Sequence, residues 1–218
     1  MGEHPIKIMS EFFIELFSEE IPSNLQKSAR KNTLDNFKKL FESNNISFKK
    51  SFSYSVPNRL IVVFEGLPNK IIEKKHEIRG PNTKAPDKAL EGFLRSNNIF
   101  KEQIFKRETE KGEFYFYTKP EKKFTTHDFL KENIPFALNE IKWKKSMKWA
   151  DYNLNWARPL KSILATFKNK TLEFTFHHIV SSNFTFLDKE FEDKKKVFKN
   201  FKSYSNYLKK TGVIINHD

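Results

Sequence analysis

The chain has 218 residues, no cysteine, and 40 Lys and Arg against 27 Asp and Glu, which gives a formal net charge of +13. The lack of cysteine excludes disulfides and cysteine-bound zinc, and no apolar run approaches the roughly 20 residues that a membrane-spanning helix needs. Aromatic residues make up 15% of the chain, which argues against intrinsic disorder, and the positive charge favours a polyanionic partner. The N-terminus shows no secretion signal, so we expect a folded cytoplasmic protein that does not enter a membrane.

The first third of the chain predicts a strand, a helix and a hairpin. Residues 1–8 are expected to be a leader or flexible start, with Met9 as a candidate alternative start site. Residues 11–17 are typical of a buried strand, and the apolar positions from Leu25 to Phe41 recur with helical spacing. Residues 52–65 alternate between apolar and polar on both sides of Pro57-Asn58, which predicts two strands joined by a tight turn.

The rest of the chain continues to mix strands and helices. We expect a short helix after Asp87, a strand at 113–118, a helix to Ile141, two strands between residues 160 and 176, and a last helix over 194–210. No internal repeat and no Gly/Ser linker divides the chain. The sequence therefore predicts an α+β fold with a mixed or antiparallel sheet and flanking helices over residues 9–192. Residues 193–218 are expected to form a trailing basic amphipathic helix and the start of a truncated next region.

Positive charge is concentrated in two segments. Residues 142–149 hold Lys142, Lys144, Lys145 and Lys148 with no acidic residue, and residues 194–210 hold seven lysines with no acidic residue. Lysines between Trp143 and Trp149 are able to contact phosphates while the flat rings stack on unpaired bases. The alternative is that both Trp side chains anchor the core and that the lysines only keep the surface soluble.

No constellation of catalytic residues is visible. Glu19 and Glu20 stand before the first helix, where negative charge stabilises a helix N-terminus, and we prefer this structural role to acid/base chemistry. His177 and His178 are adjacent and would point to opposite faces of a strand, so they cannot share a metal. Phosphate-binding loops, dinucleotide-binding fingerprints, nucleophile elbows and zinc-protease motifs are all missing from the sequence. We therefore assign no catalytic residue and no metal ligand.

Several segments, read in chain order, resemble the N-terminal region of the beta subunit of bacterial tetrameric glycyl-tRNA synthetase. Its Thr-Glu-Glu-Leu-Pro turn is similar to residues 18–22, its Pro-Arg-Arg-Leu segment to 57–60, and its Lys-Arg-Gly-Pro turn to 78–81. Its Lys-x-Met-Arg-Trp and Phe-x-Arg-Pro motifs are similar to 145–149 and 156–159. Further similarities lie at 88–99, 111–113 and 210–215, so that the resemblance covers residues 10–215. Where the family has Arg-Gly-His-Arg-Phe, residues 187–191 keep only the Phe.

The resemblance implies a role in attaching glycine to tRNA(Gly). In that family the alpha subunit makes glycyl-adenylate and binds ATP and Mg²⁺, whereas the beta subunit binds tRNA and is required for charging. It also implies a domain akin to the B3/B4 module of phenylalanyl-tRNA synthetase. We therefore expect the alpha subunit and tRNA(Gly) as partners and no cofactor bound by this chain. The residues predicted to contact tRNA are Lys142, Lys144, Lys145, Lys148, Arg59, Arg79 and Arg158, and the alternative for the three arginines is that they brace turns.

Two other functions remain open at the level of sequence. An editing-type hydrolase acting on aminoacyl-tRNA predicts a concave pocket with convergent polar groups near Glu19, Glu20 or the strand ends. A non-catalytic interaction module predicts an apolar patch that docks on the alpha subunit.

Overall fold

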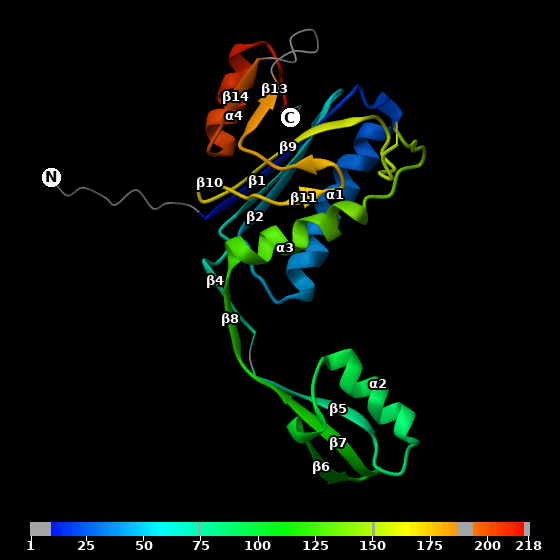
Figure 1. Cartoon of the computed structure of the whole chain (residues 1–218). Helices are drawn as coiled ribbons and strands as arrows, with labels where there is room; N and C mark the ends of the chain where they lie inside the picture. Colours follow the sequence, from blue (N-terminus) through cyan, green and yellow to red (C-terminus); the bar gives the residue numbers. More distant parts are fainter. Residues whose placement is uncertain (1–9, 74, 150, 187–193, 216–218) are drawn as a thin grey trace, which may run out of the picture. The chain divides into compact units, whose positions relative to one another are not determined.

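The computed structural model describes residues 10–73, 75–149, 151–186 and 194–215, which fold into two compact units. The main unit comprises Met1–Asn69 and Thr125–Asp218, and the insert unit is Lys70–Phe124. Figure 1 shows the elements of each unit. The single domain expected over residues 9–192 is thus interrupted, because the insert residues pack among themselves to form a separate unit. The predicted leader at residues 1–8 lies outside the described residues.

An antiparallel five-stranded sheet forms the centre of the main unit. Its strand order is β10-β9-β1-β3-β2. The strands are β1 (Glu11–Ser18), β2 (Lys50–Val56), β3 (Arg59–Glu65), β9 (Leu160–Phe167) and β10 (Lys170–Thr171). The predicted first strand and the predicted hairpin around Pro57-Asn58 are confirmed, and the expected α+β class holds with an antiparallel sheet.

Helices α1 (Ser23–Ser43) and α3 (Thr126–Asn139) lie together on one side of the sheet. Phe12 of β1 packs 5.3 Å from Phe37 of α1, measured between ring centroids. The Asn36 side-chain amide of α1 donates a hydrogen bond of 3.3 Å to the Ala137 carbonyl of α3. Pro135 lies inside α3, which continues to Asn139.

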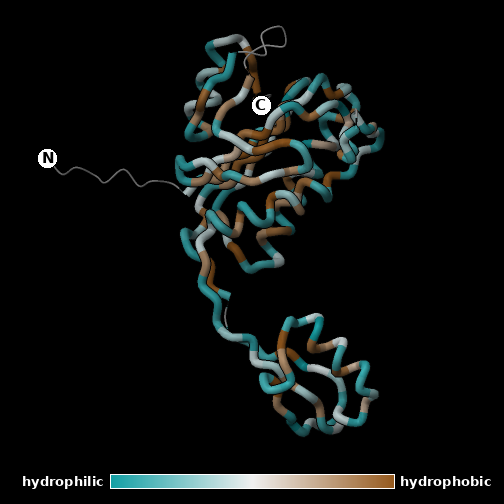
Figure 2. The backbone as a smooth tube through the Cα atoms, in the orientation of Figure 1, coloured by the Kyte–Doolittle hydropathy of each residue, from teal (hydrophilic) through white to brown (hydrophobic). Residues whose placement is uncertain are grey.

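The opposite face of the sheet is covered by α4 (Phe201–Lys210). Phe13 of β1 contacts Tyr204 of α4 with ring centroids 4.9 Å apart, and Tyr204 and Leu208 are buried. Strand β1 is therefore buried on both faces, which explains its nearly continuous apolar sequence. Figure 2 shows hydrophobic residues concentrated along the central strands.

The last helix was predicted over residues 194–210, but it begins only at Phe201, so the predicted start is wrong. Lys195–Val197 form strand β14, which pairs with β13 (Phe184–Phe186), and Val197 is 55% exposed. Helix α4 begins only after Asn200, whose side chain accepts a 2.9 Å hydrogen bond from the Ser203 N–H. Strand pairing and this helix cap together override the helical spacing of the sequence. Because α4 packs on the sheet, it belongs to the main unit and is not a separate trailing region.

The insert unit contains its own three-stranded antiparallel sheet and one longer helix. The sheet order is β5-β7-β6. These elements are β5 (His76–Asn82), α2 (Asp87–Asn97), the short 3-10 helix η1 (Lys101–Gln103), β6 (Ile104–Thr109) and β7 (Gly112–Lys119). Strands β4 (Lys70–Glu73) and β8 (Lys122–Thr125) pair where the insert begins and ends.

A small hairpin of β11 (Thr175–Phe176) and β12 (Ile179–Val180) completes the main unit. Its turn holds His177 and His178, both exposed, and the ring of His178 stacks on Tyr152 at 3.6 Å between centroids. Among the helices that the structure describes, none is long and apolar enough to cross a membrane.

Candidate nucleic-acid interface

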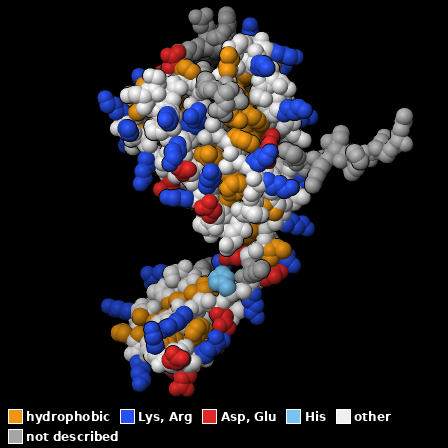
Figure 3. Space-filling view, turned by 180° about the vertical axis from the view of Figure 1, so that it is seen from behind, with side chains coloured by type: hydrophobic (Ala, Val, Ile, Leu, Met, Phe, Trp, Pro, Cys, Tyr) orange, Lys and Arg blue, Asp and Glu red, His pale blue; other side chains and the backbone are white. Residues whose placement is uncertain are grey.

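The four predicted lysines lie on one loop of the main unit, here called the basic loop (residues 140–159), which joins α3 to β9. Lys142, Lys144, Lys145 and Lys148 are all exposed. The Lys142 N–H donates a 2.8 Å hydrogen bond to the Asn32 side chain of α1, which fixes the start of the loop. On the face shown in Figure 3, Lys and Arg side chains project from many places on the surface of each unit.

Two backbone hydrogen bonds hold the basic loop together. The Met147 N–H donates to the Trp156 carbonyl at 2.9 Å, and the Trp156 N–H donates to the Met147 carbonyl at 3.2 Å. This pair brings residues 145–149 beside residues 155–160, although no regular strand pairing joins them. The lysines between these anchors therefore face solvent from a fixed backbone.

The tryptophans of the loop pack inward. The Trp143 ring lies 5.1 Å from the Trp156 ring between centroids, and Trp156 is only 2% exposed. Trp143 and Trp149 are half-buried, and each indole N–H is shielded from solvent without an acceptor among the described residues. This geometry supports the anchoring role for both side chains, with the lysines as the groups that are available to a ligand.

Arg158 lies between two clefts of the main unit. The smaller, of about 270 Å³, brings Arg158 together with Lys145. The larger, of about 750 Å³, is lined by Arg158, Lys161 and the turn that carries Glu19 and Glu20. Lys161 was not predicted from the sequence as a site residue. The sequence feature that could have indicated it is its position three residues after Arg158, at the start of a predicted strand.

Arg59 is turned into the protein. Its side chain donates to the Glu15 carboxylate, to the Thr185 hydroxyl at 2.6 Å and to the Phe186 carbonyl at 2.6 Å. Burial opposes the charge of the guanidinium, but the Glu15 carboxylate outweighs this and holds the pKa of Arg59 above its ordinary value. At 2% exposed, Arg59 is not part of the exposed surface, and its side chain links β3 to β1 and β13.

Arg79 belongs to the insert unit and is exposed. Its guanidinium lies 3.6 Å from the centroid of the Phe114 ring. The segment at 187–191 that departs from the family motif lies outside the described residues. Within the described parts of the chain, no group of three or more His, Cys, Asp or Glu side chains is placed to hold a metal ion.

Comparison with known proteins identifies the family. Residues 12–218 match the family described as glycyl-tRNA synthetase beta subunit. The chain belongs to this family. Proteins named glycine–tRNA ligase beta subunit from Rickettsia bellii and Rickettsia prowazekii are 37% and 35% identical to it over 207 and 208 residues. Each alignment covers 95% of this chain but 31% of the relative, so the chain spans about a third of their length.

The family motifs quoted from the sequence meet in space beside the larger cleft. The Ser18 N–H donates to the Asn58 carbonyl at 2.9 Å, and the Glu19 N–H donates to the Pro159 carbonyl at 3.0 Å. Segments 18–22, 57–60 and 156–159, which are far apart in the chain, thus share one set of backbone hydrogen bonds. The second motif also contacts β1 in the protein interior, through the ion pair of Arg59 with Glu15.

Proposed function

We propose that this chain is the N-terminal part of the beta subunit of a cytoplasmic glycine–tRNA ligase, where it contributes tRNA binding and subunit contacts. Glycyl-adenylate would form in a partner alpha subunit, which binds ATP and Mg²⁺, and the acceptor would be tRNA(Gly). Family membership supports this assignment. The chain itself then supplies no adenylate chemistry, in keeping with a sequence that has no nucleotide-binding motif.

The observation that carries the RNA-binding role is the basic loop. Four exposed lysines lie within seven residues on a backbone fixed by Asn32, Met147 and Trp156, and Arg158 shares a cleft with one of them. A lysine that contacts a phosphate displaces condensed counterions, and this release makes a large contribution to affinity for nucleic acid. Because the loop backbone is fixed, the charges are presented with little cost in backbone ordering.

The test replaces Lys142, Lys144, Lys145 and Lys148 together by Gln and measures affinity for a tRNA(Gly) transcript at several salt concentrations. Each phosphate contact contributes about 0.7–0.9 to the slope of log affinity against log salt, so the slope should fall by about 3. The matched control replaces four exposed lysines of the main unit outside the loop, namely Lys39, Lys49, Lys50 and Lys170, by Gln. Equal losses in both variants would show that only overall charge matters and would contradict the assignment.

The subunit role has its own experiment. Full-length beta chains with wild-type sequence or with the four Lys→Gln changes are co-expressed with an alpha subunit, and glycylation of tRNA(Gly) is measured. We expect a higher KM for tRNA at an unchanged KM for glycine and ATP, because the changes affect only the RNA contact. An altered KM for ATP would place the basic loop near the adenylate site. It would contradict the proposal that the alpha subunit forms the adenylate while this loop binds only tRNA.

A second candidate function, editing-type hydrolysis of aminoacyl-tRNA, is favoured by the larger cleft. Its lining includes Ser18, Glu19, Glu20, Gln26 and Arg158, which is the concave polar pocket that this hypothesis predicts. The chain would then deacylate a mischarged tRNA, and Glu19→Gln with Glu20→Gln would remove the activity. A rate of deacylation equal to that in buffer alone would reject this candidate while leaving the tRNA-binding role intact.

A further inference from the structure

The small sheet of the insert unit has one face that its helix covers and one that it does not. Phe93 of α2 lies so close to Gly80 of β5 that a methyl group on this glycine would come within 2.9 Å of the ring. Successive residues of a strand point to opposite faces, so Arg79 faces away from α2. The face that carries Arg79 is here called the open face.

Strand register defines the other residues of the open face. Arg79 of β5 is opposite Phe116 of β7, and Phe116 is opposite Phe105 of β6. Directly opposed residues lie on the same face of a sheet, as do residues two apart on one strand. The described residues at these positions include no aliphatic side chain: they are Glu77, Arg79, Asn82, Phe105, Arg107, Thr109, Gly112, Phe114, Phe116 and Thr118.

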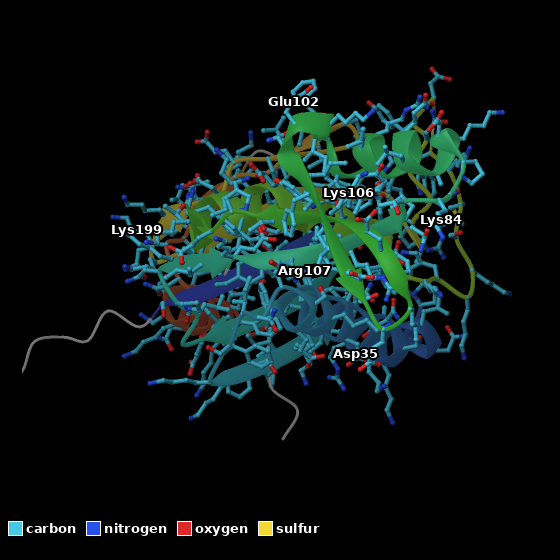
Figure 4. All side chains as sticks on the ribbon, turned by 90° about the horizontal axis from the view of Figure 1, so that it is seen from below. Asp35, Lys84, Glu102, Lys106, Arg107 and Lys199 are labelled. Atoms are coloured by element: carbon cyan, nitrogen blue, oxygen red, sulfur yellow. The ribbon has the colours of Figure 1, made fainter. Side chains whose placement is uncertain are left out.

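Rings and guanidinium groups alternate across this face. The Arg79 guanidinium lies 3.6 Å from the Phe114 ring centroid, and the Arg107 guanidinium lies 4.9 Å from the Phe116 centroid. The Phe105 and Phe116 rings are 6.0 Å apart with an angle of 23° between their planes, and Phe105 is 37% exposed. Figure 4 labels Arg107 and its neighbour Lys106 on β6. Phe105, Arg79 and Arg107 are therefore the exposed π systems of this face, whereas Phe116 between them is only 9% exposed.

The two arginines differ in how their donors are used. Arg107 makes two hydrogen bonds to the Glu77 carboxylate, at 2.6 and 2.8 Å, which fix the position of its guanidinium. The Arg79 side chain makes no hydrogen bond or ion pair with any residue that the structure describes, so its guanidinium donors remain available beside the rings. The insert sequence has 14 Lys and Arg against nine Asp and Glu, an excess of five positive charges.

We propose that the open face binds unpaired nucleotides of RNA, with a base stacked beside Phe105 and Arg107 and a phosphate held by Arg79. This site is separate from the basic loop, and the proposal rests on the tRNA-binding role proposed above. Unpaired bases stack on aromatic rings and on guanidinium planes, and RNA-binding sheets use aromatics on neighbouring strands in this way. A protein partner is less favoured, because the face has positive charge and flat rings but no aliphatic side chains to bury.

The experiment uses the whole chain and a fluorescein-labelled 12-nucleotide single-stranded RNA, with the same RNA in a duplex for comparison. Phe105→Leu keeps an apolar side chain but removes the ring, and we expect about a 5- to 100-fold loss of affinity for the single strand. Arg79→Gln should lower the salt slope by about 0.7. Phe105→Tyr should bind as the wild type does, and affinity for the duplex should change less than twofold in each variant.

Two matched controls lie in the same unit outside the open face. Phe100→Leu removes a ring that is 74% exposed, and Arg95→Gln removes an exposed charge from α2. Both should bind single-stranded RNA as the wild type does. If Phe105→Leu and Arg79→Gln behave like these controls, or weaken duplex binding equally, the proposal is overturned.

A crosslinking measurement decides the matter even if Phe105→Leu unfolds the insert. RNA containing 4-thiouridine, irradiated on the wild-type chain, should crosslink to peptides that contain Phe105 or Phe116. Crosslinks to other peptides alone would overturn the proposal, as would displacement of the RNA by an acidic peptide that does not compete with tRNA. If lysine changes in the basic loop weaken tRNA binding while open-face changes do not, this proposal fails and the proposed function stands. If only the open-face changes matter, the role of the basic loop fails instead.

Discussion

The carboxylate of Glu15 and the guanidinium of Arg59 form an ion pair inside the main unit, between residues 44 positions apart in the chain. Their side chains are 0% and 3% exposed. The Tyr204 hydroxyl donates to the same Glu15 oxygen at 2.8 Å, and the Thr185 hydroxyl donates to it at 3.0 Å. Four elements, β1, β3, β13 and α4, therefore meet at one buried carboxylate.

Replacing Arg59 by Met should be strongly destabilising, because it leaves the buried Glu15 carboxylate without its counter-charge. Loss of one partner from a buried ion pair costs about 3–5 kcal/mol, and we expect urea unfolding to show a decrease of this size in the free energy of unfolding. Lys31→Met is the control, since it removes a cation from the exposed pair with Asp35. An exposed pair contributes about 0–1 kcal/mol, so equal effects in both variants would contradict the buried pairing.

Tyr204→Phe tests the attachment of α4 to the sheet. The change removes one donor from the buried carboxylate and should cost about 1–3 kcal/mol at neutral pH. Burial, and then the negative charge of Glu15, hold the pKa of Tyr204 well above its ordinary value. The unfolded chain therefore loses the phenol proton first as pH rises above about 10, and the stability contributed by Tyr204 falls from that pH upward.

The difference in unfolding free energy between wild type and Tyr204→Phe should accordingly shrink above about pH 10. Tyr207→Phe, on the same helix but half-buried, is the control and should show a smaller cost at neutral pH. A difference between wild type and Tyr204→Phe that does not change with pH would mean that the Tyr204 phenol is not shielded as the structure indicates.

Glu11 gives the protein a second pH dependence, which has the same sign as that of Tyr204 but lies at lower pH. Its carboxylate accepts a 2.8 Å hydrogen bond from the Phe201 N–H at the start of α4, and Glu65 is its cross-strand partner. Burial raises the pKa of Glu11, the Phe201 N–H lowers it, and the charge of Glu65 raises it, with a net upward shift. A carboxyl group with a raised pKa contributes stability while protonated and loses it as pH rises through the folded-state value.

Glu11→Gln should therefore gain stability relative to the wild type as pH rises from about 4 to 7, because Gln keeps the acceptor without the charge. Thermal unfolding at several pH values measures this trend. Glu65→Gln removes the negative charge that Glu11 faces and so lowers the pKa of Glu11. The stability of this variant should therefore fall less between about pH 4 and 7 than that of the wild type. Parallel stability curves for wild type and Glu11→Gln would contradict the assignment.

Much of the main unit follows from local sequence pattern, whereas its charged interior does not. Strand β1, helix α1 and the Pro57-Asn58 hairpin carry periodicities that extend over whole elements, so each was predictable. The burial of Arg59 depends on the register between β1 and β3, which places Phe17 opposite Arg59 and leaves Glu15 as the diagonal neighbour of Arg59. No local pattern encodes that register.

The insert unit could not be predicted from the sequence, for a different reason. Its boundaries fall at β4 and β8, which are four-residue strands without the Gly, Ser or Pro runs that mark linkers. The open face could not be predicted from the sequence either, because Arg79, Phe105 and Phe116 are separated in sequence and come together only through sheet pairing. For the basic loop, sequence located the lysines correctly but left the orientation of the tryptophans undecided.

Trp143 provides the last test, because its two possible roles predict different outcomes. Its ring packs on Trp156, with the indole N–H shielded from solvent, so Trp143→Phe should keep tRNA affinity within about twofold while lowering stability. Trp143→Ala should cost about 3–5 kcal/mol, since it removes a large ring from a packed site. Lys144→Gln is the matched change in the same loop and should lower the salt slope by about 0.7–0.9 without loss of stability. A Trp143→Phe variant that is fully stable but binds tRNA tenfold more weakly would show that the ring stacks on a base and does not serve as an anchor.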